Sequence, residues 1–295
     1  MNLTKSKQRS IWAETWRRLK KDKMAITGLA FIMLLVVISL STIAIDIFTN
    51  HNIYNDFVIK QNLRMRLQGP SSEHIFGLDE FGRDIFLRML WGTRYSLFMG
   101  TFAIMFSVIV GSIFGAISGF YGKISDNIIM RFMDILLAIP SMLLATAIVA
   151  ALGTSLTNVL LAISISYIPT FARTVRASVL TIKDKEYIEA ARALGANDGR
   201  IIFKYIIPNS LAPLIVQATL GVAGAILSIA GLSFLGLGIQ PPTPEWGSML
   251  SNARTYIREG WHVTVIPGLG IMLTILALNL LGDGLRDALD PRLKN

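Results

Sequence analysis

The sequence predicts an all-α, polytopic membrane protein with six transmembrane helices, and three observations lead to this prediction. Hydrophobic residues make up 53% of the 295 residues, and charged residues only 16%. Several runs of about twenty or more residues carry no charge, which is long enough for a helix to cross the hydrocarbon core of a bilayer. Charged segments separate these runs, as they do between the spans of a polytopic protein. A soluble domain of this size does not have this composition.

The amino-terminal region, residues 1–45, combines a basic segment with the first predicted span. Residues 1–23 hold eight Lys or Arg residues and two acidic ones. Such a cluster beside a span marks the cytoplasmic side of the membrane and can lie on anionic lipid headgroups. The spacing of Trp12 and Trp16 suits a short helix at the membrane interface. The 22 uncharged residues that follow, 24–45, are long enough to span the membrane, so we expect no cleavable signal peptide.

Residues 46–94 form a mixed, charged segment that we expect on the extracytoplasmic side. Residues 74–97, at its end, have apolar side chains at helical spacing and nearly balanced charges. This pattern predicts an amphipathic helix on the outer membrane surface. Three carboxylates, Asp79, Glu80 and Asp84, leave a calcium site as the alternative, although the alternating ligands and the glycine of a calcium loop are missing.

Residues 95–295 hold the five other predicted spans, and the first of them, residues 95–122, is rich in small side chains. Gly111 and Gly115 lie four residues apart on one face of that helix, a spacing that permits close helix contact in lipid. We expect this contact to be packing within the chain. A brief cytoplasmic turn, residues 123–134, leads to the next span.

Residues 135–172 carry no charge over 38 positions, which is too long for one helix. Glycine and small polar residues punctuate the middle of this stretch, so we predict two spans joined by a tight outer hairpin. Pro140 and Pro169 are candidate kinks in these two helices. Directly before this uncharged stretch, Arg131 and Asp134 are three residues apart and can pair near the membrane boundary.

The fifth and sixth spans are predicted at residues 210–237 and 260–282. Between them, residues 238–250 contain three prolines, which forbid a continuing helix. Trp246 in this segment suits the outer membrane interface. A charged tail follows the sixth span and returns the chain to the cytoplasm.

The longest polar interruption between two spans is residues 184–213. It is predicted to form two short helices with a turn between them. Residues 186–194 are good helix formers. Gly195 suits a left-handed cap after the first helix, Asn197 can cap the second, and Pro208 is expected to end it.

The charge around this loop predicts its side of the membrane. Seven Lys or Arg residues lie in and just before the loop, against four Asp or Glu residues, which places it in the cytoplasm. In the first helix Ile188, Ala191, Arg192 and Gly195 fall near one face, and Glu189 and Lys185 lie on another. From the residues alone, the loop can equally be a solvated connector between two spans.

The sequence contains no pattern that supports catalysis, and we expect neither an enzyme nor a bound cofactor. There is no GxxxxGK[ST] phosphate loop and no cysteine, and the three histidines are scattered. No paired carboxylates or nucleophile constellation is present. The net charge of +9 is spread over helix ends, which argues against a nucleic-acid partner. The predicted spans are nearly free of ionisable groups, which argues against a proton- or sodium-coupled carrier.

The loop resembles the EAA loop in permease subunits of binding-protein-dependent ATP-binding cassette importers. In that family the loop is a coupling helix that docks into a groove on the ATPase subunit. Tyr205 and Ile207 depart from the usual residues before the proline, but both keep a bulky apolar side chain. The resemblance implies ATPase coupling for six residues: Glu189, Ala190, Ala191, Gly195, Asp198 and Pro208.

Two further stretches resemble the C-type permease subunit of dipeptide, oligopeptide and nickel importers. Residues 77–84, GLDEFGRD, are similar to a family segment that usually reads GTDxxGRD, with Leu78 in place of threonine. Residues 283–291 are similar to the family's carboxyl terminus. The resemblance implies the type I importer permease fold, with 184–213 as its coupling loop.

The resemblance also implies a function and partners. The chain is expected to be the permease of an ATP-driven dipeptide or oligopeptide importer and to form half of the translocation path. The implied partners are a second homologous permease, two cytoplasmic ATPases that bind the ATP, an extracytoplasmic substrate-binding protein and membrane lipid. The implied location is a bacterial cytoplasmic membrane, with both termini in the cytoplasm. A nickel or glutathione importer of the same family, and an ATP-independent channel or carrier, are the alternatives. No residue of the substrate path is predicted.

Overall fold

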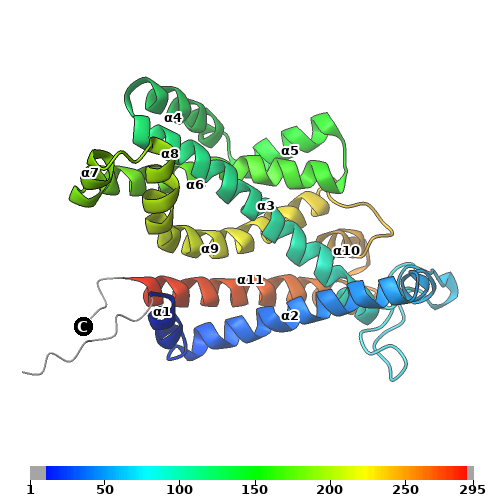
Figure 1. The fold of residues 1–295 in the computed structure, drawn as a ribbon. Coiled ribbons are helices and arrows are strands. Elements are labelled where there is room, and N and C mark those ends of the chain that lie inside the picture. Colours follow the sequence, from blue (N-terminus) through cyan, green and yellow to red (C-terminus); the bar gives the residue numbers. More distant parts are fainter. Residues whose placement is uncertain (1–10, 291–295) are drawn as a thin grey trace, which may run out of the picture.

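The computed structural model describes residues 11–290, and all its regular elements are helices apart from one isolated β-bridge between Leu78 and Asp84. Helices α2 (Lys23–Phe48) and α11 (Trp261–Leu289) run side by side along one side of the molecule, and α3 (Ile85–Tyr121) crosses away from them (Figure 1). The other long helices, α6 (Leu156–Ile182) and α9 (Ile207–Phe234), pack on α3. The remaining α-helices are α1 (Ile11–Leu19), α4 (Lys123–Ala138), α5 (Ser141–Leu152), α7 (Glu186–Ala193), α8 (Asp198–Ile201) and α10 (Trp246–Ala253).

The predicted all-α fold with six crossings is confirmed, and one of the six consists of two helices with a sharp bend between them. In the described part of the chain, five helical stretches are long and apolar enough to cross a membrane: α2, α3, α6, Asp198–Phe234 and α11. Helices α4 and α5 form a sixth candidate only together, because they meet at an angle of 90°. Alone, the 12 residues of α5 cover about 18 Å, which is shorter than the hydrocarbon core.

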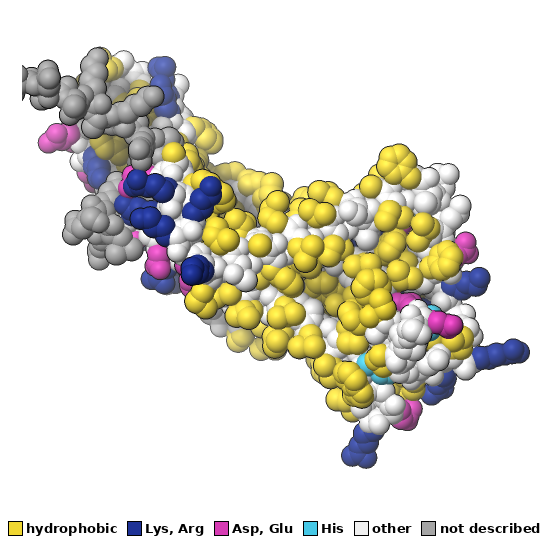
Figure 2. All heavy atoms as spheres, turned by 90° about the horizontal axis from the view of Figure 1, so that it is seen from below, with side chains coloured by type: hydrophobic (Ala, Val, Ile, Leu, Met, Phe, Trp, Pro, Cys, Tyr) yellow, Lys and Arg dark blue, Asp and Glu magenta, His cyan; other side chains and the backbone are white. Residues whose placement is uncertain are grey.

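The segments that the sequence predicts on opposite sides of the membrane lie at opposite ends of the molecule. Helices α1, α7 and α8 and the last turn of α11 lie at one end, while residues 49–84 and α10 lie at the other (Figure 1). Figure 2 shows the face formed by α2, where apolar side chains fill a band between charged ends. Met33, Leu34, Val37 and Leu40 contribute to this band and are about half exposed. Such a band suits contact with lipid.

The predicted surface helix over residues 74–97 is wrong. Residues 74–84 form turns, and α3 then runs unbroken for 37 residues from Ile85. The Asp84 carboxylate accepts a hydrogen bond from the Leu87 amide at 3.0 Å, so Asp84 caps the helix at its first turn. The apolar spacing around Ile85 and Met89 therefore belongs to the start of the second span, and the predicted boundary at residue 94 falls inside that helix.

The predicted turn over residues 123–134 is also wrong, because α4 occupies it. Gly122, with φ +62°, ends α3, and α4 begins at the next residue. The candidate kink at Pro140 is a complete break between α4 and α5: Ile139 is extended, as expected of a residue before proline, and α5 starts at Ser141. Asp134 pairs with Arg173 of α6 at 2.5 Å, in place of the expected pairing with Arg131.

Two expectations about the start of the fifth span and the segment after it are wrong. Pro208 does not end the second loop helix: α8, a π-helical turn at Ile202–Ile206 and α9 form one continuous stretch. Pro208 lies in the first turn of α9, where a missing amide hydrogen is tolerated. Trp246 does not lie at the interface. It is buried at the start of α10, and its indole N–H donates to the Met89 carbonyl at 3.1 Å.

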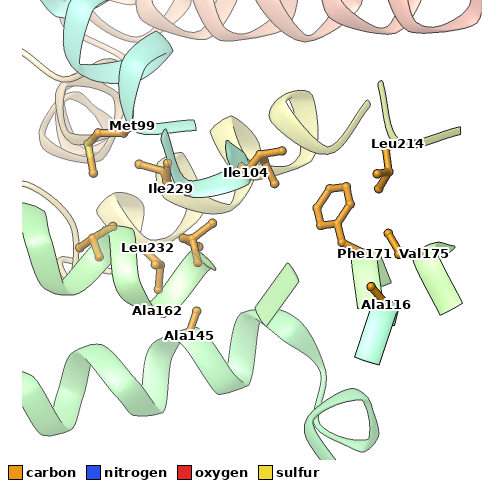
Figure 3. Close-up of a cluster of buried hydrophobic side chains, with 14 of the residues drawn as sticks. Met99, Ile104, Ala116, Ala145, Ala162, Phe171, Val175, Leu214, Ile229 and Leu232 are labelled. Carbon is orange, nitrogen blue, oxygen red and sulfur yellow. The ribbon is translucent and has the colours of Figure 1, made fainter. Parts of the chain in front are cut away.

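The core is centred on α3, α6 and α9. Met99 and Ile104 of α3, Phe171 of α6 and Ile229 of α9 are buried together, and Ala145 of α5 closes the cluster (Figure 3). A second cluster joins α2, α3, α9, α10 and α11 around the buried Trp246. The loop elements α7 and α8 extend the first cluster beyond the spans.

The expected close packing at Gly111 and Gly115 is confirmed, and it is packing within the chain. These residues and Gly119 form a stripe of α3 that lies directly on α6. A β-carbon on Gly115 would lie 2.3 Å from the Ala172 carbonyl oxygen and 2.9 Å from the Val175 β-carbon. The backbones of α3 and α6 can approach this closely only because the stripe has no side chains.

We expect Gly115→Ala to destabilise the protein, because the added methyl group would force the backbones of α3 and α6 apart. The expected cost is about 1–3 kcal/mol, typical of overpacking. Thermal unfolding in detergent measures it. Gly69→Ala is the matched control, because nothing lies within 4 Å of the added carbon. An unchanged midpoint for Gly115→Ala would contradict the role of the glycine stripe.

Candidate functional site

The loop between α6 and α9 has the two-helix structure that its sequence predicts. Gly195 has φ +81°, and its amide donates to the Arg192 carbonyl at 2.9 Å, which closes α7. The Asn197 side chain accepts from the Arg200 amide at 2.8 Å and caps α8. Both turn residues therefore act as expected and fix the angle between the two helices.

One side of the loop is anchored in the core. Ile188 of α7, Ile201 of α8 and Ile206 of the π-turn are all buried in the cluster that contains Val179 and Ile182 of α6. Ala191 is buried too, whereas Arg192 and Gly195, which the helical spacing places near the same face, are exposed. The loop is thus an extension of the α3–α6 core rather than a tether between two spans.

A contact between α7 and the end of α3 supports the same conclusion. The Arg192 guanidinium lies 5.3 Å from the centre of the Phe120 ring, within the range of a cation–π interaction. Phe120 itself packs edge-on against Tyr121. Arg192 therefore fixes α7 to the last turn of α3, while Ile188 packs the same helix against α6.

The other side of the loop is exposed and mixes charged and apolar side chains. Leu194 is 89% exposed and Phe203 71% exposed, although both are large and apolar. Glu189, Ala190 and Arg200 are exposed on the same segment. Single exposed apolar residues are common, but two beside helix ends in a polar loop suit an interface with another protein.

The structure separates the six residues implied in coupling into two groups. Ala191 faces the core. The other five are exposed along the loop: Glu189, Ala190, Gly195, Asp198 and Pro208. Sequence reasoning missed Leu194 and Phe203, although bulky apolar residues flanking the polar turn were the available signal.

Ion pairs fasten α4 to α6 just before the loop. Arg176 of α6 donates twice to Asp126 of α4, with both N–O distances 2.6 Å, and Ser118 of α3 also donates to Asp126. The Arg173–Asp134 pair lies three residues earlier on α6 and is more exposed. These contacts join α3, α4 and α6 at the end of the molecule that holds the loop.

A buried charge cluster organises the opposite end. Asp79 accepts from the Arg83 side chain at 2.7 Å and lies 3.3 Å from the Arg88 guanidinium. Its other oxygen accepts from the Phe81 and Arg83 amides. Burial, together with the neighbouring Asp79 charge, raises the pKa of the Glu80 carboxyl. The GLDEFGRD segment is therefore a tight turn held by its own charges.

The described residues contain no group of three or more acidic or histidine side chains placed to hold a metal ion. The carboxylates weighed as calcium ligands have other partners. Asp79 and Glu80 pair with Arg83, and Asp84 lies 2.8 Å from the His74 ring nitrogen. The calcium alternative therefore has no support in this turn.

Comparison with protein families identifies the chain. The family described as the binding-protein-dependent transport system inner membrane component matches residues 111–295. The chain belongs to this family. A second family, the N-terminal transmembrane domain of oligopeptide transport permease C, matches residues 10–70 of the permease. As a member of the importer family, the permease is a membrane component that works with an ATPase and a substrate-binding protein.

The permease is similar over nearly its whole length to curated relatives. It is 51% identical to the dipeptide transport system permease protein DppC of Alkalihalophilus pseudofirmus, over 97% of this chain and 91% of the relative. It is 44% identical to the glutathione transport system permease protein GsiD of Pectobacterium atrosepticum, over 97% and 93%. These relatives are transport permeases rather than enzymes.

Solved structures support the fold. The permease aligns with a chain of the MetNI methionine ABC transporter in an inward-facing conformation, with a TM-score of 0.56 and 21% identity. The match covers 70% of the permease and 98% of the other chain. At this identity the likeness shows a shared permease fold.

The burial of Asp79 leads to a prediction about the stability of the end of the molecule opposite the loop. Asp79→Asn removes the charge that faces two buried guanidinium groups, so the free energy of unfolding should fall by about 3–5 kcal/mol. Thermal unfolding of the purified permease measures the change. Glu73→Gln, an exposed carboxylate in the same segment, should have no measurable effect. Equal midpoints for both variants would contradict the anchoring role of Asp79.

Two loop variants test whether the buried side of α7, and not its exposed side, holds the loop on the core. Ile188→Ala should destabilise by about 2–5 kcal/mol, because it leaves a cavity between α7 and the core. Leu194→Ala should stay within about 0.5 kcal/mol of the parent, because that side chain is exposed. Hydrogen exchange of the α7 amides, read with thermal unfolding, measures both. Fast exchange in both variants, or in neither, would contradict the described packing.

Proposed function

We propose that this chain is one of two permease subunits of an ATP-driven importer of dipeptides or oligopeptides. It forms half of the translocation path and pairs with a second, homologous permease. Two ATPase subunits bind the ATP, and an extracytoplasmic binding protein delivers the substrate. The chain itself needs no bound cofactor and carries out no catalysis.

The observation that carries this proposal is the structure of the loop over residues 184–213. Its inner side is anchored on α3 and α6, and its outer side presents Glu189, Leu194 and Phe203. A partner that moves this loop must therefore move α3 and α6 with it. For such a movement to transmit energy, the loop must make different contacts in the two states of the ATPase.

The orientation follows from the same grouping. The basic helix α1, the loop and the end of α11 lie at one end of the molecule (Figure 1). We place that end in the cytoplasm, because Lys and Arg concentrate beside the cytoplasmic ends of spans. Residues 49–84 and α10 then face the binding protein on the other side.

A peptide substrate is favoured by the similarity to the two permeases named above. The dipeptide permease is the more similar of the two, at 51% identity against 44%. Glutathione, itself a small peptide, is the second candidate because of the 44% match. Competition of labelled dipeptide uptake by unlabelled dipeptide and by glutathione, in cells that express the complete transporter, distinguishes the two.

Co-purification tests the coupling role. We expect the tagged wild-type chain to bring down two ATPases and a second permease from its native membrane. Glu189→Lys and Gly195→Asp should lose the ATPases, or lose at least tenfold in substrate uptake with the ATPases still bound. The first change reverses an exposed charge, and the second disfavours the left-handed cap at φ +81°.

Glu259→Lys, an exposed charge reversal at the opposite end, is the control and should keep the ATPases. If the wild-type chain purifies alone and still moves solute, the loop is only a connector. If both loop variants couple normally, the role assigned to Glu189 and Gly195 fails.

A further inference from the structure

A cavity of about 460 Å³ lies where α1 and the turn after it meet the last turns of α11. Three cations line it, together with two carboxylates and two small residues of α11. The lining residues are Arg17, Arg18, Lys21, Asp22, Gly284, Asp287 and Ala288. No function considered above uses this cavity.

The nearby carboxylates Asp22 and Glu14 bond to other groups, so they do not pair with Arg17 or Lys21. Asp22 caps α2, and one oxygen accepts from the Met24 and Ala25 amides at 2.8 and 3.2 Å. Glu14 pairs with Arg18 at 2.8 Å. Within the described residues 11–290, the side chains of Arg17 and Lys21 have no hydrogen-bond or ion-pair partner.

The nearby sequence adds cations rather than anions. Lys20 and Lys23 flank the cavity residues, and Lys20 lies over the Trp16 ring at 5.1 Å. The stretches 1–10 and 291–295 contain five further Lys or Arg residues and no Asp or Glu. These segments therefore offer Arg17 and Lys21 no acidic side chain, and the cavity's own Asp287 makes no ion pair with either cation within residues 11–290.

The position of the cavity points to a class of ligand for these two cations. Leu19 is buried against α11, while Trp12 and Trp16 on the same helix are about half exposed. The apolar run of α2 begins at Met24, directly after the basic turn. Figure 2 shows the basic side chains gathered beside the apolar band. Exposed tryptophans next to basic residues at the edge of an apolar band occur at the headgroup level of a membrane.

We propose that this cavity binds the phosphate of an anionic phospholipid. Arg17 and Lys21 contact the phosphate oxygens, and the acyl chains lie along the exposed apolar side of α2. Asp287, which has no partner in the described chain, lies at the same cavity and disfavours a second negative charge on the headgroup. A singly charged lipid such as phosphatidylglycerol fits this arrangement better than a multiply charged one.

The proposal is tested with the complete transporter purified in detergent. Native mass spectrometry is used to titrate phosphatidylglycerol, and phosphatidylcholine of the same chain length in parallel. We expect phosphatidylglycerol to bind at least tenfold more tightly. The double variant Arg17→Gln/Lys21→Gln should lower that affinity by about thirtyfold, as expected for two basic residues near an anionic surface. Phosphatidylcholine binding should be unchanged.

The control removes the same number of positive charges elsewhere. Arg64→Gln/Arg258→Gln alters two exposed cations outside the spans and should leave the phosphatidylglycerol affinity within twofold of the parent. An equal loss in both double variants would show only a net-charge effect and overturn the site. Competition by inorganic phosphate at millimolar concentration would also overturn it, in favour of a soluble anion.

The same samples distinguish a lipid site from a protein contact. Arg17→Gln/Lys21→Gln should keep the ATPases and the second permease at wild-type levels. Loss of a subunit with lipid binding intact would show that the cavity binds protein and would overturn the proposal. The result does not depend on the transported substrate, so failure here and failure of the coupling role are separate outcomes.

Discussion

The rest of the structure depends on the close approach of α3 and α6. Three glycines of α3 at four-residue spacing let its backbone lie against α6, and this pair makes the most extensive helix contact in the described chain. At this distance the two helices are held together by van der Waals packing, and a shift of one helix along the other would produce steric clashes. Helix α9 then packs on both, and the core side chains of Figure 3 fill the space between them.

This pair links the two ends of the molecule. At one end, α3 begins beside the Asp79–Arg83–Arg88 cluster, where the Arg88 guanidinium also donates to the Pro242 carbonyl. At the other end, Arg192 and Ile188 of the loop rest on α3 and α6. One rigid helix therefore joins the turn before the second span to the loop that we assign to the ATPase. Within the described chain, no break in the helix separates these two ends.

Sequence reasoning predicted features with local causes and missed those with tertiary ones. Gly195 and Asn197 cap their helices because capping depends only on neighbouring backbone groups. Helix α4 was missed because its charges resemble those of a cytoplasmic turn, and its partners are distant in sequence: ion pairs to α6, and Met133 buried against Ile168 and Ala172. Trp246 was misplaced because its burial depends on residues more than 150 positions away. The exposure of Leu194 and Phe203 was missed because their position beside a polar turn is only a weak signal, and large apolar residues are usually buried.

The exposed side chains Leu194 and Phe203 also bear on how the protein is assembled in the cell. In the proposed arrangement, a permease made without its ATPases would expose these apolar side chains to the cytosol on a loop that the core holds in place. Because chaperones and proteases act on incompletely assembled chains in cells, the proposed coupling role implies that a permease without ATPases is removed faster than an assembled one.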